Sequence, residues 1–374
     1  ASGDLVIIAH PAFLPLDGSE PHPLNDYLAD RIDGGWNPVL FDITEIQTHY
    51  GNGMALPQAV NRFLTDADAA FEFEHVLLVG SDSYDYSDNF GLGSISFIPT
   101  HYAATRFINY TPSDALLADL NGNGLADKAV GRWPVRTVGD LQATVSKTLD
   151  WAANGGQDRS AIWVTDSEDA NVPSFLGQAN RMFGVLENEG WPDANLDRIF
   201  WGDVEPVDGQ SIADTARAQF FDSLEQGRAL TGFSGHGAPT VWTFQGLLTP
   251  TDFNELYNEG KPTLIGTLTC YTSYFVSPFN DTVAHRWMNG YREDAAGNRI
   301  PGVPNGAVAI HGAATLSNYA QNEVFAGKVL EYQLEGLTLG QSVERARAEA
   351  RARGIEDLVI NWTLLGDPTI TIQQ

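Results

Sequence analysis

The sequence predicts an α/β protein whose largely parallel sheet is flanked by helices. Short runs rich in Val, Ile and Leu alternate along its 374 residues with amphipathic segments, and these two patterns are typical of strands and helices. Many of the apolar runs end at Gly, Ser or Asp, as buried parallel strands do. Because strands that alternate with helices become parallel neighbours in one sheet, this order favours the α/β class.

The apolar runs define eight expected strands. In chain order they are Leu5–Ala9, Pro38–Asp42, His75–Gly80, Ala161–Thr165, Arg198–Trp201, Leu230–Ser234, Thr263–Thr267 and Ala307–His311. Pro or an Asp, Ser or Thr cap precedes several of the amphipathic segments, which supports their assignment as helices. The eight expected helices are approximately Leu24–Arg31, Leu56–Phe71, Asp140–Ala152, Val172–Asn188, Ile212–Gln226, Thr282–Met288, Glu323–Glu335 and Leu339–Arg353.

A Gly-rich, polar segment, Asn154–Asp158, follows an expected helix near the middle of the chain. At roughly 150 residues per domain, a chain of this length suggests two domains or one two-part domain. We therefore expect an N-terminal α/β subdomain at residues 1–155 and a second α/β subdomain at residues 156–374. The two halves could share one continuous sheet.

The charge of the chain argues against some partners. Lys and Arg total 21 and Asp and Glu total 48, which gives a formal net charge of −27. Such an acidic protein would repel a phosphate backbone, so we expect no nucleic-acid partner. No apolar run approaches the roughly 18 residues that a membrane helix needs, so we expect no membrane span in this chain.

Two expected strands are followed closely by residues with nucleophilic or acid–base chemistry. His236 lies two residues after the strand Leu230–Ser234, and Cys270 lies three residues after the strand Thr263–Thr267. Their separation of 34 positions (270 − 236) fits one helix and a return to the neighbouring parallel strand. Because ligands bind at the carboxyl ends of the strands in open α/β sheets, we expect both side chains at one edge of the sheet.

The pairing of an imidazole with a thiol points to nucleophilic catalysis. A nearby imidazole can take the proton of a thiol and later protonate a leaving amine. The N–H groups of Gly237 and Cys270 could form an oxyanion hole, since glycine lets its backbone approach a substrate carbonyl closely. Taken singly, these residues also fit a turn with a satisfied histidine and a buried, inert thiol. A serine hydrolase is less well supported, because Ser234 lacks the GxSxG spacing.

Several segments resemble, in order, those of the gingipain-like cysteine peptidases. LTGFSGHGAPTVW resembles the catalytic-histidine segment of that family, and TLTCYTSYF resembles its catalytic-cysteine segment. Four further segments are similar: HVLLVGSDSYDYSDN followed by FIPTHY, LADLNGNGLADKAVGRWPVRTVGDLQATVSKTLDW, NGAVAIHGAATLSNY and NWTLLGDPTI. The likeness spans about Pro38 to Ile370.

The resemblance implies a caspase-like fold in two subdomains, with catalysis in the second. Carried over to this chain, it makes Cys270 the nucleophile and His236 the general base and acid. Gly237 and Cys270 would supply the N–H groups of the oxyanion hole. Glu72 and Glu74, just before a strand of the first half, are candidates for an acid that orients His236.

The primary pocket of the family suggests further candidates. Its best-known members cleave after Arg or Lys and place an acidic residue in that pocket. Where the arginine-specific members have Asp after Leu-Val-Gly, this chain has Ser81 and then Asp82. Asp82 or a later aspartate of the same loop could supply the charge, and a solvated loop or a cation site is the alternative. Trp242 and Tyr319 resemble positions where the family places aromatics near the pocket, with core packing as the alternative for Trp242.

The segment 119–127 has the alternating oxygen-bearing residues of a calcium loop. Its candidate ligands are Asp119, Asn121, Asn123, Leu125 through its carbonyl, and Asp127. Full EF-hand spacing is absent because the twelfth position is Val130, so an Asn-Gly-rich turn is the alternative. Members of the resembled family often carry structural calcium, which favours a calcium site. We expect no organic cofactor, and no HExxH or CxxC spacing supports zinc.

Together these features predict a cysteine endopeptidase that hydrolyses protein or peptide substrates through a thioacyl-enzyme formed by a Cys-His dyad. A transpeptidase with the same dyad is an alternative, because an amine could outcompete water. A non-catalytic cell-surface interaction module is another. We expect a secreted or cell-surface bacterial protein whose signal or pro-segment is absent from this chain.

Overall fold

Ten strands form one continuous sheet in the order β2-β1-β3-β6-β14-β13-β12-β9-β7-β8. The structure is a computed structural model that describes residues 4–15, 21–93, 96–154, 159–279 and 281–372. The strands of the sheet are β1 Leu5–Ala9, β2 Pro38–Asp42, β3 His75–Val79, β6 Ala129–Trp133, β7 Ala161–Thr165, β8 Leu196–Ile199, β9 Leu230–Ser234, β12 Thr263–Leu268, β13 Ala307–Ala313 and β14 Trp362–Gly366. Strand β14 is antiparallel to β13, and its parallel pairing with β6 consists of one residue pair, Leu365 and Arg132.

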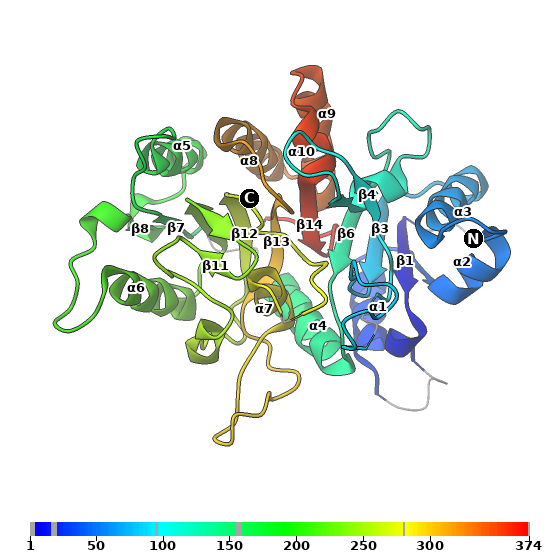
Figure 1. The fold of residues 1–374 in the computed structure, drawn as a ribbon, viewed down its shortest axis with the longest axis horizontal. Coiled ribbons are helices and arrows are strands. Elements are labelled where there is room, and N and C mark those ends of the chain that lie inside the picture. The colour runs from blue at the N-terminus through cyan, green and yellow to red at the C-terminus, as the bar shows by residue number, and fades with distance from the viewer. Residues whose placement is uncertain (1–3, 16–20, 94–95, 155–158, 280, 373–374) are drawn as a thin grey trace.

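Helices cover both faces of the sheet (Figure 1). Their bounds are α1 Pro23–Asp33, α2 Ile43–Tyr50, α3 Leu56–Ala70, α4 Val138–Ala153, α5 Phe175–Asn188, α6 Ile212–Gln226, α7 Val283–Asn289, α8 Tyr319–Leu334, α9 Leu339–Ala352 and α10 Glu356–Asn361. Helices α1, α4, α6 and α7 lie on one face, and α2, α3, α5, α8 and α9 lie on the other. No helix among the described residues is long and apolar enough to cross a membrane.

Alternate side chains of a strand pack against the helices on opposite faces of the sheet. In β1, Leu5 and Ile7 pack in the same hydrophobic cluster as residues of α1 and α4. Val6 and Ile8 point to the opposite face and pack with residues of α2 and α3. Successive residues of a strand face opposite sides of the sheet, so a continuous apolar run such as β1 is buried on both faces.

All eight expected strands and all eight expected helices are present. Strands β1, β2, β7 and β9 and helix α6 have the predicted bounds, and β8 begins two residues earlier than expected. Strands β6 and β14 and helices α2 and α10 were not expected. In β6, Gly131 and Arg132 interrupt the apolar run on which strand prediction depends.

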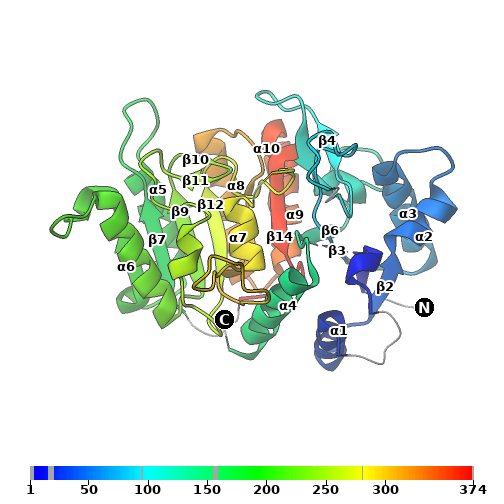
Figure 2. The same ribbon diagram turned by 60° about the horizontal axis from the view of Figure 1, so that its bottom comes forward.

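The sheet is continuous across the two predicted halves. Strand β14, from the end of the chain, lies between β6 and β13 (Figure 2). The predicted boundary between residues 155 and 156 lies outside the described residues. The division into residues 1–155 and 156–374 therefore stays a prediction.

Arg132, the fourth of the five residues of β6, is fully buried. Its Nε and Nη2 atoms donate to the two carboxylate oxygens of Asp114, each at 2.7 Å, and Nη1 donates to the carbonyls of Gly80 and Ile98 at 2.6 and 2.9 Å. The guanidinium also lies 4.7 Å from the ring centroid of Phe275. This one side chain therefore joins the loops after β3 to the segment that follows Cys270.

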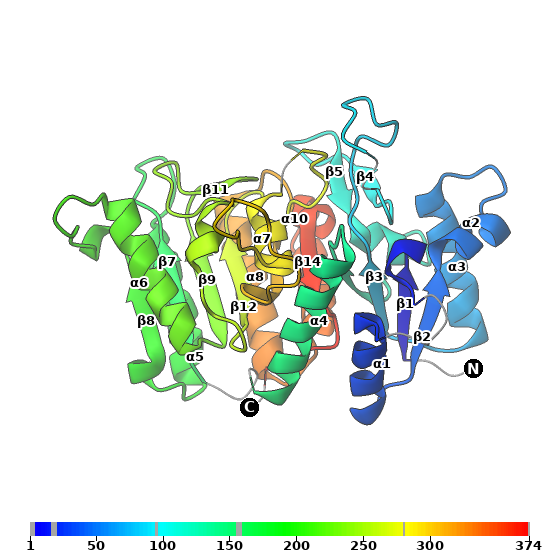
Figure 3. The same ribbon diagram turned by 90° about the horizontal axis from the view of Figure 1, so that it is seen from below.

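Two further contacts join the same segments. The Ser81 hydroxyl, just after β3, donates to the carbonyl of Phe275 at 3.3 Å, and the Tyr84 N–H donates to the carbonyl of Val276 at 3.2 Å. The segments that follow β3 and β12 consequently meet at one edge of the sheet. The short hairpins β4–β5 (His101–Ala103 and Thr111–Ser113) and β10–β11 (Gly237–Ala238 and Val241–Trp242) lie along this edge (Figure 3).

We predict that Arg132→Leu lowers the free energy of unfolding by about 3–5 kcal/mol, because it leaves the buried Asp114 carboxylate without its ion-pair partner. The measurement is urea denaturation followed by circular dichroism. Arg62→Leu, on the exposed side of α3, is the control and should change stability by less than about 0.5 kcal/mol. The double variant Arg132→Leu/Asp114→Leu should recover part of the loss. A loss below about 1 kcal/mol for Arg132→Leu would contradict this account.

Candidate active site

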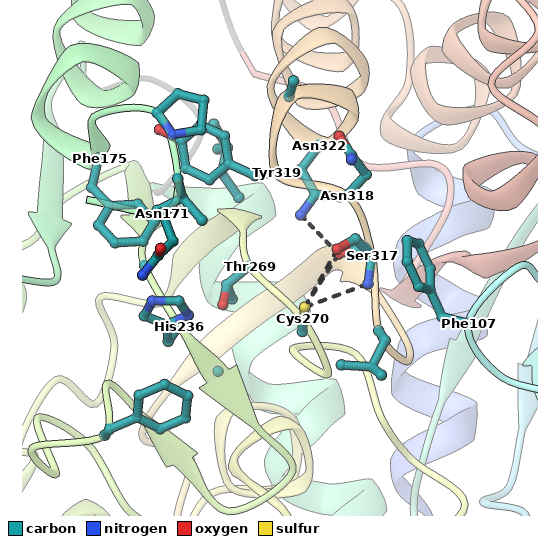
Figure 4. A pocket seen from close by; sticks show the side chains of 18 residues that line it. Phe107, Asn171, Phe175, His236, Thr269, Cys270, Ser317, Asn318, Tyr319 and Asn322 are labelled. Atoms are coloured by element: carbon teal, nitrogen blue, oxygen red, sulfur yellow. Dashed lines mark hydrogen bonds between the residues drawn. The ribbon is translucent and has the colours of Figure 1, made fainter. Parts of the chain in front are cut away.

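His236 and Cys270 occupy equivalent positions on neighbouring parallel strands. Strands β9 and β12 pair in register, with Ser234 opposite Leu268. Each of the two residues lies two positions beyond this pair, so both emerge at the carboxyl edge of the sheet. Both line the same pocket, which has a volume of about 530 Å³ (Figure 4). The structure thus brings these two sequence-predicted residues together.

The loops that carry the two residues are in close contact. A Cβ atom placed on Gly237 would lie 2.6 Å from the carbonyl oxygen of Cys270 and 2.7 Å from Oγ1 of Thr269. Real Cβ atoms do not approach other atoms so closely, so only glycine permits this arrangement. Gly237, the predicted oxyanion-hole residue, therefore lies against the backbone of Cys270 and lines the pocket.

The backbone is strained on both sides of the site. Tyr271, directly after Cys270, has φ 57°, and Thr243, whose N–H donates to the carbonyl of His236 at 2.9 Å, has φ 59°. An aromatic and a β-branched residue both pay a steric cost in this left-handed region. Such conformations persist where the surrounding structure imposes them, and they concentrate at functional sites.

Two aspartates of the loop between β7 and α5 contact His236. Nε2 of His236 lies 3.2 Å from Oδ2 of Asp169, and the backbone N–H of His236 donates to Oδ2 of Asp166 at 3.0 Å. The pKa of Asp169 is lowered mainly by the hydrogen bond from the backbone N–H of Asn171, and His236 makes a smaller contribution. Burial instead raises the pKa of Asp166. Asp169 is thus held in its charged form beside the imidazole.

Two phenylalanines fix the plane of the imidazole. Phe244 stacks on His236 with ring centroids 4.8 Å apart, and Phe175 meets it edge-on at 5.3 Å. Nδ1 of His236 has no hydrogen-bond partner within the part of the chain that the structure describes. The arrangement leaves that nitrogen available to a substrate or to the thiol.

The thiol of Cys270 contacts three polar groups of Ser317, a residue that follows β13. The N–H of Ser317 lies 3.4 Å from Sγ, the hydroxyl of Ser317 lies 3.6 Å from it, and the thiol can donate to the Ser317 carbonyl at 3.7 Å. Asn322 of α8 in turn donates to the Ser317 hydroxyl at 2.8 Å. No hydrogen bond joins Cys270 to His236 among the described residues, and both side chains point into the pocket (Figure 4).

Of the three predicted pocket residues, Asp82, Trp242 and Tyr319, only Tyr319 lines the pocket. Tyr319 lines the pocket, and its hydroxyl donates to the carbonyl of Ser174 at 2.6 Å. Trp242 does not line it: the indole is 1% exposed and stacks on Phe233 at 4.5 Å, as the core-packing alternative held. The prediction that Trp242 lies at the pocket is therefore wrong, and Trp242 is a core residue.

Asp82 also does not line the pocket, because its carboxylate is buried inside its own loop. It accepts hydrogen bonds from the N–H groups of Ser83 and Thr100 and from the hydroxyls of Ser96, Tyr86 and Tyr102. Burial raises the pKa of this carboxyl. The prediction that Asp82 supplies a pocket charge is wrong, since its oxygens are already occupied in shaping the loop.

Glu72 and Glu74 cannot orient His236. They precede β3, at the opposite edge of the sheet from the site, and Glu74 accepts a hydrogen bond from the side chain of Gln341 at 2.7 Å. The carboxylates in contact with His236 are Asp166 and Asp169, which sequence reasoning missed. The sequence shows only that both follow the expected strand Ala161–Thr165, and it does not show that this strand lies next to β9.

The predicted calcium loop is an exposed turn held by its own hydrogen bonds. Asp119 accepts from the N–H groups of Asn123 and Gly124, and Asp127 accepts from those of Leu120 and Asn121. The side-chain oxygens of Asn121 and Asn123 accept from N–H groups two residues later. The described residues contain no cluster of three or more His, Cys, Asp or Glu side chains placed to hold a metal, so this loop would depend on amide and backbone oxygens as well.

Solved structures of peptidases share this architecture. Gingipain R from Porphyromonas gingivalis matches with a TM-score of 0.74 and 18% identity over 100% of this chain and 78% of that chain. The complex of the pro- and mature domains of Porphyromonas gingivalis RgpB matches with a TM-score of 0.72 and 18% identity over 99% of this chain and 80% of that chain. At this identity the likeness establishes the fold, which is the gingipain, caspase-like α/β fold.

The sequence itself carries a family assignment. No curated protein sequence matches the chain. Residues 1–373, however, match peptidase family C25 over nearly the whole length. The chain therefore belongs to peptidase family C25 and is a cysteine peptidase of the gingipain-like fold.

Proposed function

We propose that the protein is a cysteine endopeptidase in which Cys270 attacks the peptide carbonyl and His236 moves the proton. One observation carries the proposal. His236 and Cys270 leave adjacent strands at equivalent positions and meet in one pocket, with Asp169 bonded to the far nitrogen of the imidazole. A nucleophile, a base and a group that orients the base are the parts that covalent catalysis requires.

The contact with Asp169 determines which nitrogen acts. A carboxylate on Nε2 favours the tautomer with its proton there, because only that tautomer donates to it. Nδ1 then carries the lone pair and can accept the thiol proton. The sulfur attacks the carbonyl carbon, and the tetrahedral oxyanion is stabilised by the N–H groups of Gly237 and Cys270. Protonated Nδ1 gives its proton to the leaving amine as the C–N bond breaks, and water then hydrolyses the thioester.

The surroundings of the sulfur support the same role. The N–H and hydroxyl of Ser317 both lie within donor distance of Sγ, so they can stabilise negative charge on the sulfur before attack. Asn322 holds the Ser317 hydroxyl from the first turn of α8. An inert, structural thiol would need neither of these donors.

We predict that the protein cleaves a fluorogenic peptide library that varies the residue before the scissile bond, and that Cys270→Ala and His236→Ala abolish cleavage. The reason is that each variant removes one member of the dyad. Mass spectrometry of the products distinguishes hydrolysis from transfer to an added amine. Cleavage that survives in Cys270→Ala would refute the assignment of the nucleophile, and an unreactive parent would favour the non-catalytic module.

Asp169 should act as a positioning residue. We predict that Asp169→Asn lowers kcat at least about tenfold with little change in KM, because an amide can donate to Nε2 and favour the wrong tautomer. Glu168→Gln is the matched control from the same loop. Glu168 accepts from the Ser174 hydroxyl and the Leu176 N–H, and a glutamine oxygen can keep both bonds. Equal kcat for Asp169→Asn and the parent would remove Asp169 from the mechanism.

We also propose that the loop 119–127 binds structural calcium through Asp119, Asn121, Asn123, the Leu125 carbonyl and Asp127. Calcium prefers oxygen ligands of this kind. At about one hundred times its dissociation constant, calcium should stabilise the protein by about 2.7 kcal/mol relative to EDTA. Thermal unfolding with and without calcium measures this, and Asp127→Asn should weaken the effect. A melting temperature that is insensitive to calcium would leave only the Asn-Gly-rich turn.

A further inference from the structure

The pocket that holds Cys270 has no acidic wall. Among the described residues that line it, none is Asp, Glu, Lys or Arg, and His236 is the only basic side chain. A pocket that selects Arg or Lys needs a carboxylate to pair with the buried cation, since an unpaired buried charge is strongly disfavoured. This pocket offers none.

The carboxylates closest in sequence to the pocket walls already have partners. Asp169 is bonded to His236, and Glu168 accepts from the Ser174 hydroxyl. Glu323 of α8 forms an ion pair with Arg181 of α5. A guanidinium that entered the pocket would therefore compete with these existing contacts for a carboxylate, and competition for Asp169 would weaken its contact with the imidazole.

The walls themselves are apolar and aromatic. Val172, Pro173 and Phe175 come from the loop before α5 and its first residue, and Tyr319 and Ala320 begin α8. The rings of Phe175 and Tyr319 are neighbours in the pocket (Figure 4), and their centroids lie 5.4 Å apart. Because the Tyr319 hydroxyl is bonded to the Ser174 carbonyl, the tyrosine offers its ring to the pocket and its polar end to the loop.

We propose that this pocket takes an uncharged, apolar side chain, aliphatic or aromatic, on the residue before the scissile bond, in preference to Arg or Lys. The inference rests on the proposed endopeptidase function of Cys270 and His236. Burial of such a side chain against these walls is favourable through the hydrophobic effect and contacts with the aromatic rings. Polar groups such as the Asn318 amide line the remainder of the pocket and remain available to the peptide backbone.

The net charge of −27 does not reverse this preference. Surface charges attract cationic peptides over a distance that salt limits to about 8–10 Å, and this attraction mainly raises the rate of encounter. Selection at the pocket depends on contacts made after the side chain has lost its water.

The test compares kcat/KM for matched peptides that carry Leu, Phe, Arg or Lys before the scissile bond. We expect the best apolar peptide to exceed both basic peptides at least tenfold. Cleavage that depends on Cys270 but is fastest after Arg or Lys would overturn the pocket inference and leave the proposed function intact. No Cys270-dependent cleavage of any peptide would instead refute the proposed function, and the inference would fall with it.

A charge placed in the wall provides a second measurement. Ala320 is exposed, and an aspartate in the first turn of a helix is tolerated or favourable, so Ala320→Asp should fold. We expect Ala320→Asp to gain cleavage after Arg and lose cleavage after Leu, at least tenfold in their ratio. Ala320→Asn is the matched control without a charge and should keep the parental ratio. An unchanged ratio in Ala320→Asp would show that this wall does not contact the selected side chain.

Discussion

The buried guanidinium of Arg132 holds together the edge of the sheet on which the candidate active site lies. It satisfies both oxygens of Asp114 and two carbonyls that follow β3 and precede β4, and its flat face rests on Phe275, five residues after Cys270. A buried charge of this kind is stable only when all of its partners are in place. The loops after β3 and the segment after Cys270 therefore depend on the same buried side chain for their positions.

This constraint explains how the site can hold an unfavourable backbone. Tyr271 and Thr243 adopt left-handed conformations beside Cys270 and His236, and each costs of order 1–3 kcal/mol. The segment after Tyr271 is held by the carbonyls of Phe275 and Val276, which accept from Ser81 and Tyr84. The strain next to the thiol is thus offset by contacts that reach across the sheet to β3.

The sequence predicts what local patterns determine. Strands β1 and β7 are almost continuous apolar runs, and His236 and Cys270 lie just beyond two further predicted strands, β9 and β12. Strand β6 is not predicted, because Arg132 can be buried within a strand only when it pairs with Asp114, which lies 18 residues earlier. Likewise, the partner of His236 could not be identified, because Asp169 lies 67 residues away and reaches it through sheet order, which the sequence does not display.

The pocket walls come from helix starts and loops, whose positions are the hardest to predict from sequence and in which related peptidases can differ. Helix α8 begins at Tyr319, four residues before its predicted start, and α5 begins at Phe175, three residues after its predicted start. Both helix starts supply walls of the pocket, while the register of β9 and β12 places the dyad. A change in an exposed wall residue such as Ala320 alters few core contacts, whereas a change in register would displace every buried side chain of the strand. Selectivity can therefore depart from that of other gingipain-like peptidases while the fold and the positions of His236 and Cys270 stay the same.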